Sequence, residues 1–137
     1  MTKLALSYGF GTTIDAPYEE AVARVRDALA AEGFGVLTEI DVRATLKKKL
    51  DVDFRPYVIL GACNPPLAHR ALSSELEIGL LLPCNVVVHA GDDEGTSVVS
   101  IMDPEAALSL AGNDAIAPLA ADVKARLERV VAAVGGA

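Results

Sequence analysis

The sequence has no tryptophan, few other aromatic residues and only two cysteines, and it lacks long apolar runs. Stretches without polar side chains, such as residues 78–84, are far shorter than the roughly 20 residues of a membrane-spanning helix. Two cysteines do not make a disulfide scaffold, and a structural zinc site needs four ligands. These absences predict a protein that has no membrane span and is stabilised by its own apolar core.

Basic residues are missing from a long part of the chain. Residues 71–122 contain no lysine or arginine but nine acidic residues, and the net charge of the whole chain is −7. Nucleic-acid binding needs a broad basic face, so this class of function is not expected. We interpret the one basic cluster as a solvated helix face, with a docking patch for an anion or an acidic partner as the alternative. This cluster consists of Arg43, Lys47, Lys48, Lys49 and Arg55.

The length of 137 residues and the hydrophobic content of 52% predict one folded domain over residues 1–137 and exclude a disordered chain. The first six residues contain one lysine and no apolar core of a signal peptide, so we expect a cytoplasmic protein. A domain of this size with so much apolar surface is also expected to cover part of it by forming a homodimer.

Apolar periodicity predicts five strands, over residues 4–13, 34–40, 57–63, 84–89 and 96–102. Five helices are predicted, which begin at Asp15, Asp41, Asn64, Asp103 and about Asp114. Two of them carry apolar stripes that are expected to face inward, namely Leu67, Ala71 and Leu72 in the third helix and Ile116, Leu119, Val123, Leu127, Val130 and Val134 in the last. The glycine-rich turn at residues 91–95 makes an antiparallel hairpin of the last two strands. Single helices between strands, together with one hairpin, indicate an α+β fold rather than a doubly wound α/β fold.

Three local details of this prediction can be compared with a structure. Gly9 and Gly11 interrupt the first strand, which indicates a bulge or a close approach of another backbone. The first helix is expected to hold Pro17 in its first turn. The short helix after Asp41 is expected to turn an apolar stripe inward while its lysines stay in solvent. That stripe consists of Val42, Leu46 and Leu50.

Two motifs lie in the middle of the chain. They read Gly61-Ala62-Cys63-Asn64-Pro65 and Glu77-Ile78-Gly79-Leu80-Leu81-Leu82-Pro83-Cys84-Asn85-Val86-Val87-Val88. On these motifs, the chain resembles the domain of unknown function 302 family of bacterial and archaeal proteins. The resemblance implies an α+β fold with an antiparallel sheet, of the kind seen in the TATA-binding-protein-like group, and commonly a homodimer. It implies neither an assured activity nor DNA binding.

Cys63 ends a buried strand and directly precedes a predicted helix. Asn64 is the expected cap of that helix, and Pro65 fits its first turn, where no N–H partner is needed. The helix dipole would favour a nucleophilic or metal-binding thiolate at Cys63, although Asn64 competes for the same N–H donors. The alternative is that Cys63 is a small apolar residue that completes the strand.

Cys84 lies between Pro83 and Asn85 at the start of the next strand. A right-handed crossover would make the two strands parallel and place the cysteines at opposite ends of the sheet. An antiparallel arrangement would place them at the same end, and the family resemblance favours this arrangement. We therefore expect a rim of cysteine, asparagine and proline side chains, with the face around Tyr57 beside it.

These residues support two hypotheses of function. The first is a small homodimeric binding or accessory domain that holds a small molecule or a protein partner at the Cys63 and Cys84 rim. The alternative is a thiol-based redox or metal-linked protein in which Cys63 reacts and Cys84 resolves. His69 and His89 are poorly placed to complete a zinc site, so no metal site is predicted. The sequence selects no cofactor and does not decide whether a reaction is catalysed.

Overall fold

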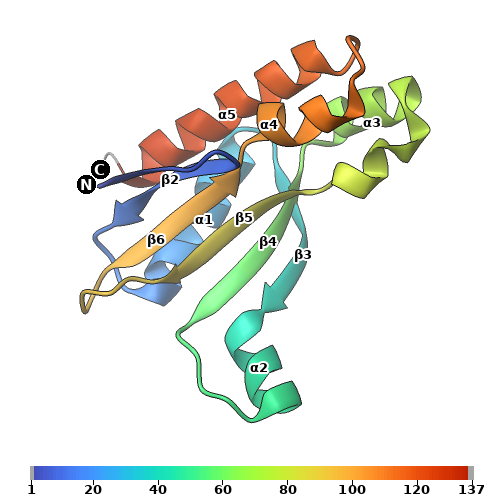
Figure 1. The fold of residues 1–137 in the computed structure, drawn as a ribbon. Coiled ribbons are helices and arrows are strands. Elements are labelled where there is room, and N and C mark those ends of the chain that lie inside the picture. Colours follow the sequence, from blue (N-terminus) through green and yellow to red (C-terminus); the bar gives the residue numbers. More distant parts are fainter. Residues whose placement is uncertain (1, 136–137) are drawn as a thin grey trace.

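The fold is a single six-stranded antiparallel sheet with helices packed against it (Figure 1). The computed structural model describes residues 2–135. The strands occur in the order β1-β2-β6-β5-β4-β3, and every neighbouring pair is antiparallel. Their bounds are β1 Lys3–Ala5, β2 Gly9–Ile14, β3 Gly35–Asp41, β4 Tyr57–Cys63, β5 Cys84–Ala90 and β6 Ser97–Met102.

Two long helices cover one face of this sheet, and the other face is open over β4 and β5 with α4 at one end (Figure 1). The long helices are α1 Tyr18–Ala31 and α5 Ala117–Gly135. Shorter elements lie at the ends of the strands. They are α2 Val42–Leu50, α3 Pro65–Ser74, the 3-10 helix η1 Leu76–Leu81, α4 Pro104–Leu108 and the 3-10 turn η2 Ser109–Ala111.

The apolar core lies between the sheet and the two long helices. Alternate residues of the central strands point into it, as the two-residue period of a strand requires. The inward stripe predicted for the last helix is buried along its whole length. Fully or almost fully buried side chains include Val25 and Leu29 of α1, Val58 and Leu60 of β4, Val86 and Val88 of β5, and Leu127 and Val130 of α5.

The N-terminal segment corrects the predicted strand count from five to six. The single strand expected over residues 4–13 is a hairpin of β1 and β2, which turn through Ser7 and Tyr8. Ser7 and Gly9 are residues that favour such a turn, which runs from Leu6 to Gly9, although the glycines had indicated only a bulge or a close backbone approach. Gly9 and Gly11 allow close approach of another backbone, because an added Cβ would clash with the carbonyl oxygens of Ile101 and Val99, respectively, on β6.

Two predicted helix details are wrong. The cap of α1 is Pro17, which precedes the helix, and Asp15 lies outside it. In α2, Val42 and Leu46 are half-buried, but Leu50 is 66% exposed. The helix projects beyond the sheet (Figure 1), which places its last turn away from the core between the sheet and the long helices. A stripe of period 3.6 identifies one face of a helix, but it does not show how much of that face is covered.

Two other predictions are confirmed. Asp41 caps α2 by accepting a hydrogen bond from the Ala44 N–H at 2.9 Å. The β4 and β5 strands are antiparallel, with Ala62 opposite Cys84.

No helix within residues 2–135 has both the length and the apolarity needed to cross a membrane. The specific likeness to the TATA-binding-protein-like group stays a prediction.

Candidate functional site

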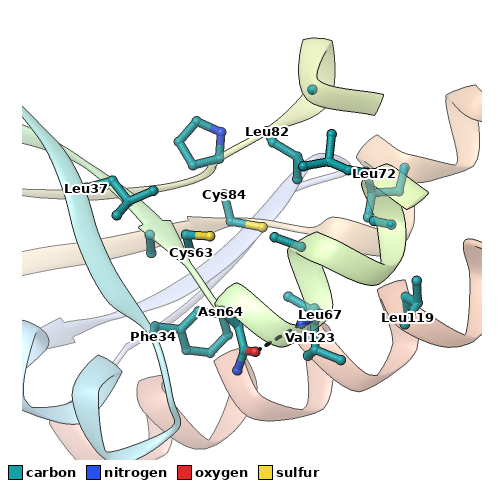
Figure 2. A pocket seen from close by; sticks show the side chains of 16 residues that line it. Phe34, Leu37, Cys63, Asn64, Leu67, Leu72, Leu82, Cys84, Leu119 and Val123 are labelled. Carbon is teal, nitrogen blue, oxygen red and sulfur yellow. Dashed lines mark hydrogen bonds between the residues drawn. The ribbon is translucent and has the colours of Figure 1, made fainter. Parts of the chain in front are cut away.

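A cavity of about 280 Å³ lies where β4 ends and β5 begins, beside α3 (Figure 2). Its wall is built from strand ends, α3, η1, the segment that leads into β5, and one face of α5. None of the residues that line it is charged. They are Phe34, Leu37, Ala62, Cys63, Asn64, Leu67, Ala68, Ala71, Leu72, Gly79, Leu82, Pro83, Cys84, Leu108, Leu119 and Val123.

Both cysteines of the chain line this cavity as free thiols. Cys63 is the last residue of β4, and Cys84 is the first residue of β5. Ala62 is the register partner of Cys84, so the two cysteines are one position apart on neighbouring strands. Figure 2 shows both sulfur atoms on the side of the strands where α3 lies. The antiparallel topology therefore places both thiols at the same end of the sheet, as expected.

Burial disfavours the thiolate form of both cysteines. It raises the pKa of the half-buried Cys63 above the ordinary value of 9.0. The pKa of the buried Cys84 is raised to about 11, first by burial and then by the neighbouring Cys63. The direction is opposite to the activation that a helix N-terminus would produce at Cys63. The structure therefore holds two neutral thiols, and neither is an activated nucleophile.

Asn64 fixes the start of α3 beside the cavity. Its Oδ1 accepts a hydrogen bond from the Leu67 N–H at 3.3 Å, and its side chain is buried. This bond satisfies one of the N–H groups that a helix start leaves free, and Pro65 and Pro66 have no N–H to satisfy. The hydrogen bond that Asn64 makes in the cavity wall is therefore structural, because it holds the start of α3.

Gly61 allows the segment before Cys84 to lie directly against the sheet. A Cβ at Gly61 would lie 2.8 Å from Cγ of Pro83 and would clash with Oγ1 of Thr38 on β3. Both contacts are too close for a side chain, so only glycine fits without a shift of the edge strand or of the proline. The peptide bond between Leu82 and Pro83 is cis. The glycine of the first motif thus positions the proline and cysteine of the second.

Three predicted site residues lie outside the cavity wall. Pro65 is exposed in the first turn of α3. Asn85 and Tyr57 line a second groove, of about 680 Å³, on the open face of the sheet. Tyr57 begins β4, whereas Cys63 ends it, and the Tyr57 ring stacks on His89 with ring centroids 5.4 Å apart. Four of the seven candidates therefore meet in one cavity, namely Cys63, Asn64, Pro83 and Cys84.

Comparison with known protein families matches residues 10–134 to the domain of unknown function DUF302. The match covers almost the whole chain and both motifs. The chain belongs to the DUF302 family. A solved structure, the uncharacterized conserved protein DUF302 from Bacillus stearothermophilus, is similar to it with a TM-score of 0.84 and 31% sequence identity. The alignment covers 93% of this chain and 98% of that one. A comparison with curated proteins finds no match.

These comparisons confirm the predicted family and the α+β fold of this DUF302 chain.

The prediction from the sequence missed the part of the cavity wall that helices supply. Leu119 and Val123 were assigned to the core as part of the inward stripe of the last helix, and Leu72 was assigned to a buried stripe. In the structure Leu119 and Val123 also face the cavity, while Leu72 is exposed at it. Periodicity finds such residues but does not distinguish a filled interior from the wall of a cavity.

The DUF302 cavity offers a metal ion only a small set of ligands. Within residues 2–135, no three histidine, cysteine, aspartate or glutamate side chains are grouped closely enough to hold a metal. His69 is exposed on α3 but does not line the cavity, and His89 lies near the far end of β5. The two thiols are therefore the strong ligands that the cavity itself provides.

Proposed function

We propose that this DUF302 domain is a binding protein whose ligand, a small molecule of low polarity, occupies the cavity beside Cys63 and Cys84. The observation that carries the proposal is the composition of the wall, which is uncharged and mostly aliphatic. Ligand sites are concave, mostly apolar and often several hundred cubic ångströms in volume, with a few polar groups that orient the ligand. Here the two thiols are the polar groups available for that role.

The neutral state of the thiols supports binding over nucleophilic chemistry. A reactive cysteine needs a lowered pKa and a positively charged neighbour, and the cavity wall supplies no charge. Burial raises the pKa of both cysteines instead. In this environment the thiols act as weak hydrogen-bond donors and polarizable contacts to an apolar ligand.

A reversible dithiol–disulfide pair is the second candidate, and the convergence of Cys63 and Cys84 on one cavity favours it. Their strands are neighbours in the sheet, which brings the two backbones close, but Cys84 is opposite Ala62 rather than Cys63, and successive residues of a strand point to alternate faces. The same raised pKa values predict slow exchange with other thiols near neutral pH. This chemistry would therefore need an oxidant that reaches the cavity.

Binding of a neutral apolar fluorophore, N-phenyl-1-naphthylamine, tests the first proposal. We expect saturable binding with one site per chain. Ala68→Phe fills the cavity from α3 and should weaken binding at least tenfold, whereas Ala125→Phe on the exposed side of α5 should leave it unchanged. Leu72→Trp at the exposed side of the wall provides a second variant if Ala68→Phe does not fold. Equal affinity of the wild type and both cavity variants would refute the assignment.

We also propose that the domain forms a homodimer through the groove on the open face of the sheet. Two chains of charge −7 repel each other, which favours association through a surface of low charge. The groove is lined by aliphatic, aromatic and small polar residues with no charged side chain. Tyr8 and Leu110 are exposed there. A second copy of this face is the partner that the uncharged surface fits.

Two exposed leucines provide a matched test of the dimer. Leu110 lines the groove and is 78% exposed, whereas Leu76 on η1 lies outside it and is 79% exposed. Light scattering coupled to size exclusion should give a dimer mass for the wild type and Leu76→Glu, and a monomer mass for Leu110→Glu. A monomer mass for the wild type at micromolar concentration, or a dimer mass for Leu110→Glu, would contradict this interface.

A further inference from the structure

We propose that Cys63 and Cys84 together form a binding site for one soft monovalent metal ion, copper(I), held between their two sulfur atoms. The two residues are the only cysteines of the chain, and both line one cavity. They lie at the same end of neighbouring antiparallel strands, and Figure 2 shows both sulfur atoms on the side where α3 lies. Neither is engaged in a disulfide. The fold thus brings two free sulfur ligands, distant in sequence by a helix and a 3-10 helix, to one place.

The ligand set selects the ion. Zinc prefers four ligands, and no third histidine, cysteine, aspartate or glutamate within residues 2–135 joins the two thiols in a cluster. Magnesium and calcium need several oxygen ligands, and the cavity wall contains no carboxylate. The side-chain oxygen of Asn64 is engaged as the cap of α3. A pair of thiolates in apolar surroundings instead suits copper(I), which takes soft sulfur ligands and tolerates a low coordination number.

Loading the ion is an exchange of cations without oxidation or reduction. One copper(I) ion forms two bonds to sulfur, the two S–H bonds break, and two protons leave to solvent. The product carries one negative charge, since the two thiolates together carry two negative charges and copper(I) carries one positive charge.

The apolar wall favours the ion in a second way. Aliphatic side chains such as Leu67 and Leu82 line the space around the sulfurs and limit the access of water and of competing thiols. A two-coordinate ion in such a cavity is protected from ligand exchange by the surrounding protein. The ion would share the cavity with the apolar ligand proposed above, but it requires the two sulfurs, whereas that ligand requires the free volume of the cavity.

Competition with a chromophoric copper(I) chelator, bathocuproine disulfonate, tests the site on reduced, metal-free protein under anaerobic conditions. We expect one copper(I) per chain and a first shell of two sulfur atoms by X-ray absorption. Cys63→Ser and Cys84→Ser should each weaken binding at least 100-fold, whereas the control His69→Ala, His89→Ala double variant should bind like the wild type. Retained binding of N-phenyl-1-naphthylamine by Cys63→Ser would show that the cavity itself is intact.

Three outcomes would overturn the proposal. The first is a ratio of one copper(I) per two chains, which would indicate an ion that bridges two copies. The second is a first shell that contains nitrogen or oxygen. The third is a serine variant that binds copper(I) as tightly as the wild type. Silver(I) provides a measurement on the wild type alone if Cys84→Ser does not fold. One equivalent of silver(I) should protect both cysteines from alkylation, and alkylation of either at an unchanged rate would refute the shared site. Failure of copper binding with intact fluorophore binding would leave the apolar-ligand proposal standing.

Discussion

The buried thiol of Cys84 gives a prediction whose size follows from the structure. Its pKa of about 11 lies two units above the ordinary value of 9.0. At pH 8, the folded protein should therefore contain about 100-fold less Cys84 thiolate than the unfolded chain. A thiolate of higher pKa is intrinsically more nucleophilic, which offsets roughly tenfold of this difference. We expect alkylation of Cys84 to be about tenfold slower from the pKa alone, and slower still because the sulfur is buried.

The assay is the rate of reaction with iodoacetamide between pH 7 and pH 10, followed by peptide mass spectrometry. The rate at Cys84 should rise tenfold for each pH unit over the whole range, because its pKa lies above it. In urea-unfolded protein, the same curve should bend near pH 9. Cys63, which is half-buried and has a less strongly raised pKa, should react faster than Cys84 at every pH.

Two results would refute this reasoning. A Cys84 rate that levels off at or below pH 9 in the folded protein would mean that burial does not raise its pKa. Faster alkylation of Cys84 than of Cys63 would mean that the cavity opens to solvent on the side of β5. Circular dichroism at each pH provides the control that the protein stays folded throughout.

Three further predictions concern stability. Asn64→Ala removes the cap of α3 and should lower the free energy of unfolding by about 1 kcal/mol in urea titrations; an unchanged value would refute the capping role. Replacing the three exposed lysines of residues 47–49 by glutamine should leave Tm nearly unchanged in calorimetry, because exposed charges contribute at most about 1 kcal/mol each; a collapse of Tm would contradict the exposed placement. Burial opposes ionisation of Asp103, but its hydrogen bond to Lys124 and two N–H bonds lower its pKa below 3.8. The ionised Asp103 should therefore stabilise the folded state fully above about pH 5, and this stabilisation should be lost as the pH falls through the lowered pKa. The difference in stability between the wild type and Asp103→Asn should then shrink below about pH 4 in acid titrations. A difference that stays constant would contradict the lowered pKa.

The features predicted correctly from the sequence are those set by neighbouring residues. The cap at Asn64 and the hairpin at residues 91–95 each depend on a few adjacent side chains, and both occur as expected. The inward stripe of α5 was predicted because nineteen helical residues provide enough turns for a clear period. The antiparallel pairing of β4 and β5 followed from the family resemblance rather than from the local sequence.

The features missed depend on what lies opposite a residue in space. Leu50 belongs to a regular apolar stripe, but α2 extends past the sheet and leaves it exposed. The turn at Ser7 and Tyr8 joins β1 to β2, whereas Gly9 beside it had been interpreted as a bulge or a close approach within one strand. At the site, the two cysteines were placed at one end correctly, whereas Tyr57 was grouped with them although it begins the strand that Cys63 ends. Position along a strand decides which residues share a site, and composition alone does not show it.

The cavity wall combines parts of the chain that are made at different times. The antiparallel pair of β4 and β5 supplies both thiols, whereas Leu119 and Val123 come from the C-terminal helix. A chain that emerges from the ribosome N-terminus first can pair these strands before α5 exists, but the cavity is complete only after α5 has docked. A ligand of the cavity therefore binds only the finished protein, and it stabilises that state by mass action. In the cell, supply of the ligand would raise the amount of folded protein as well as its occupancy.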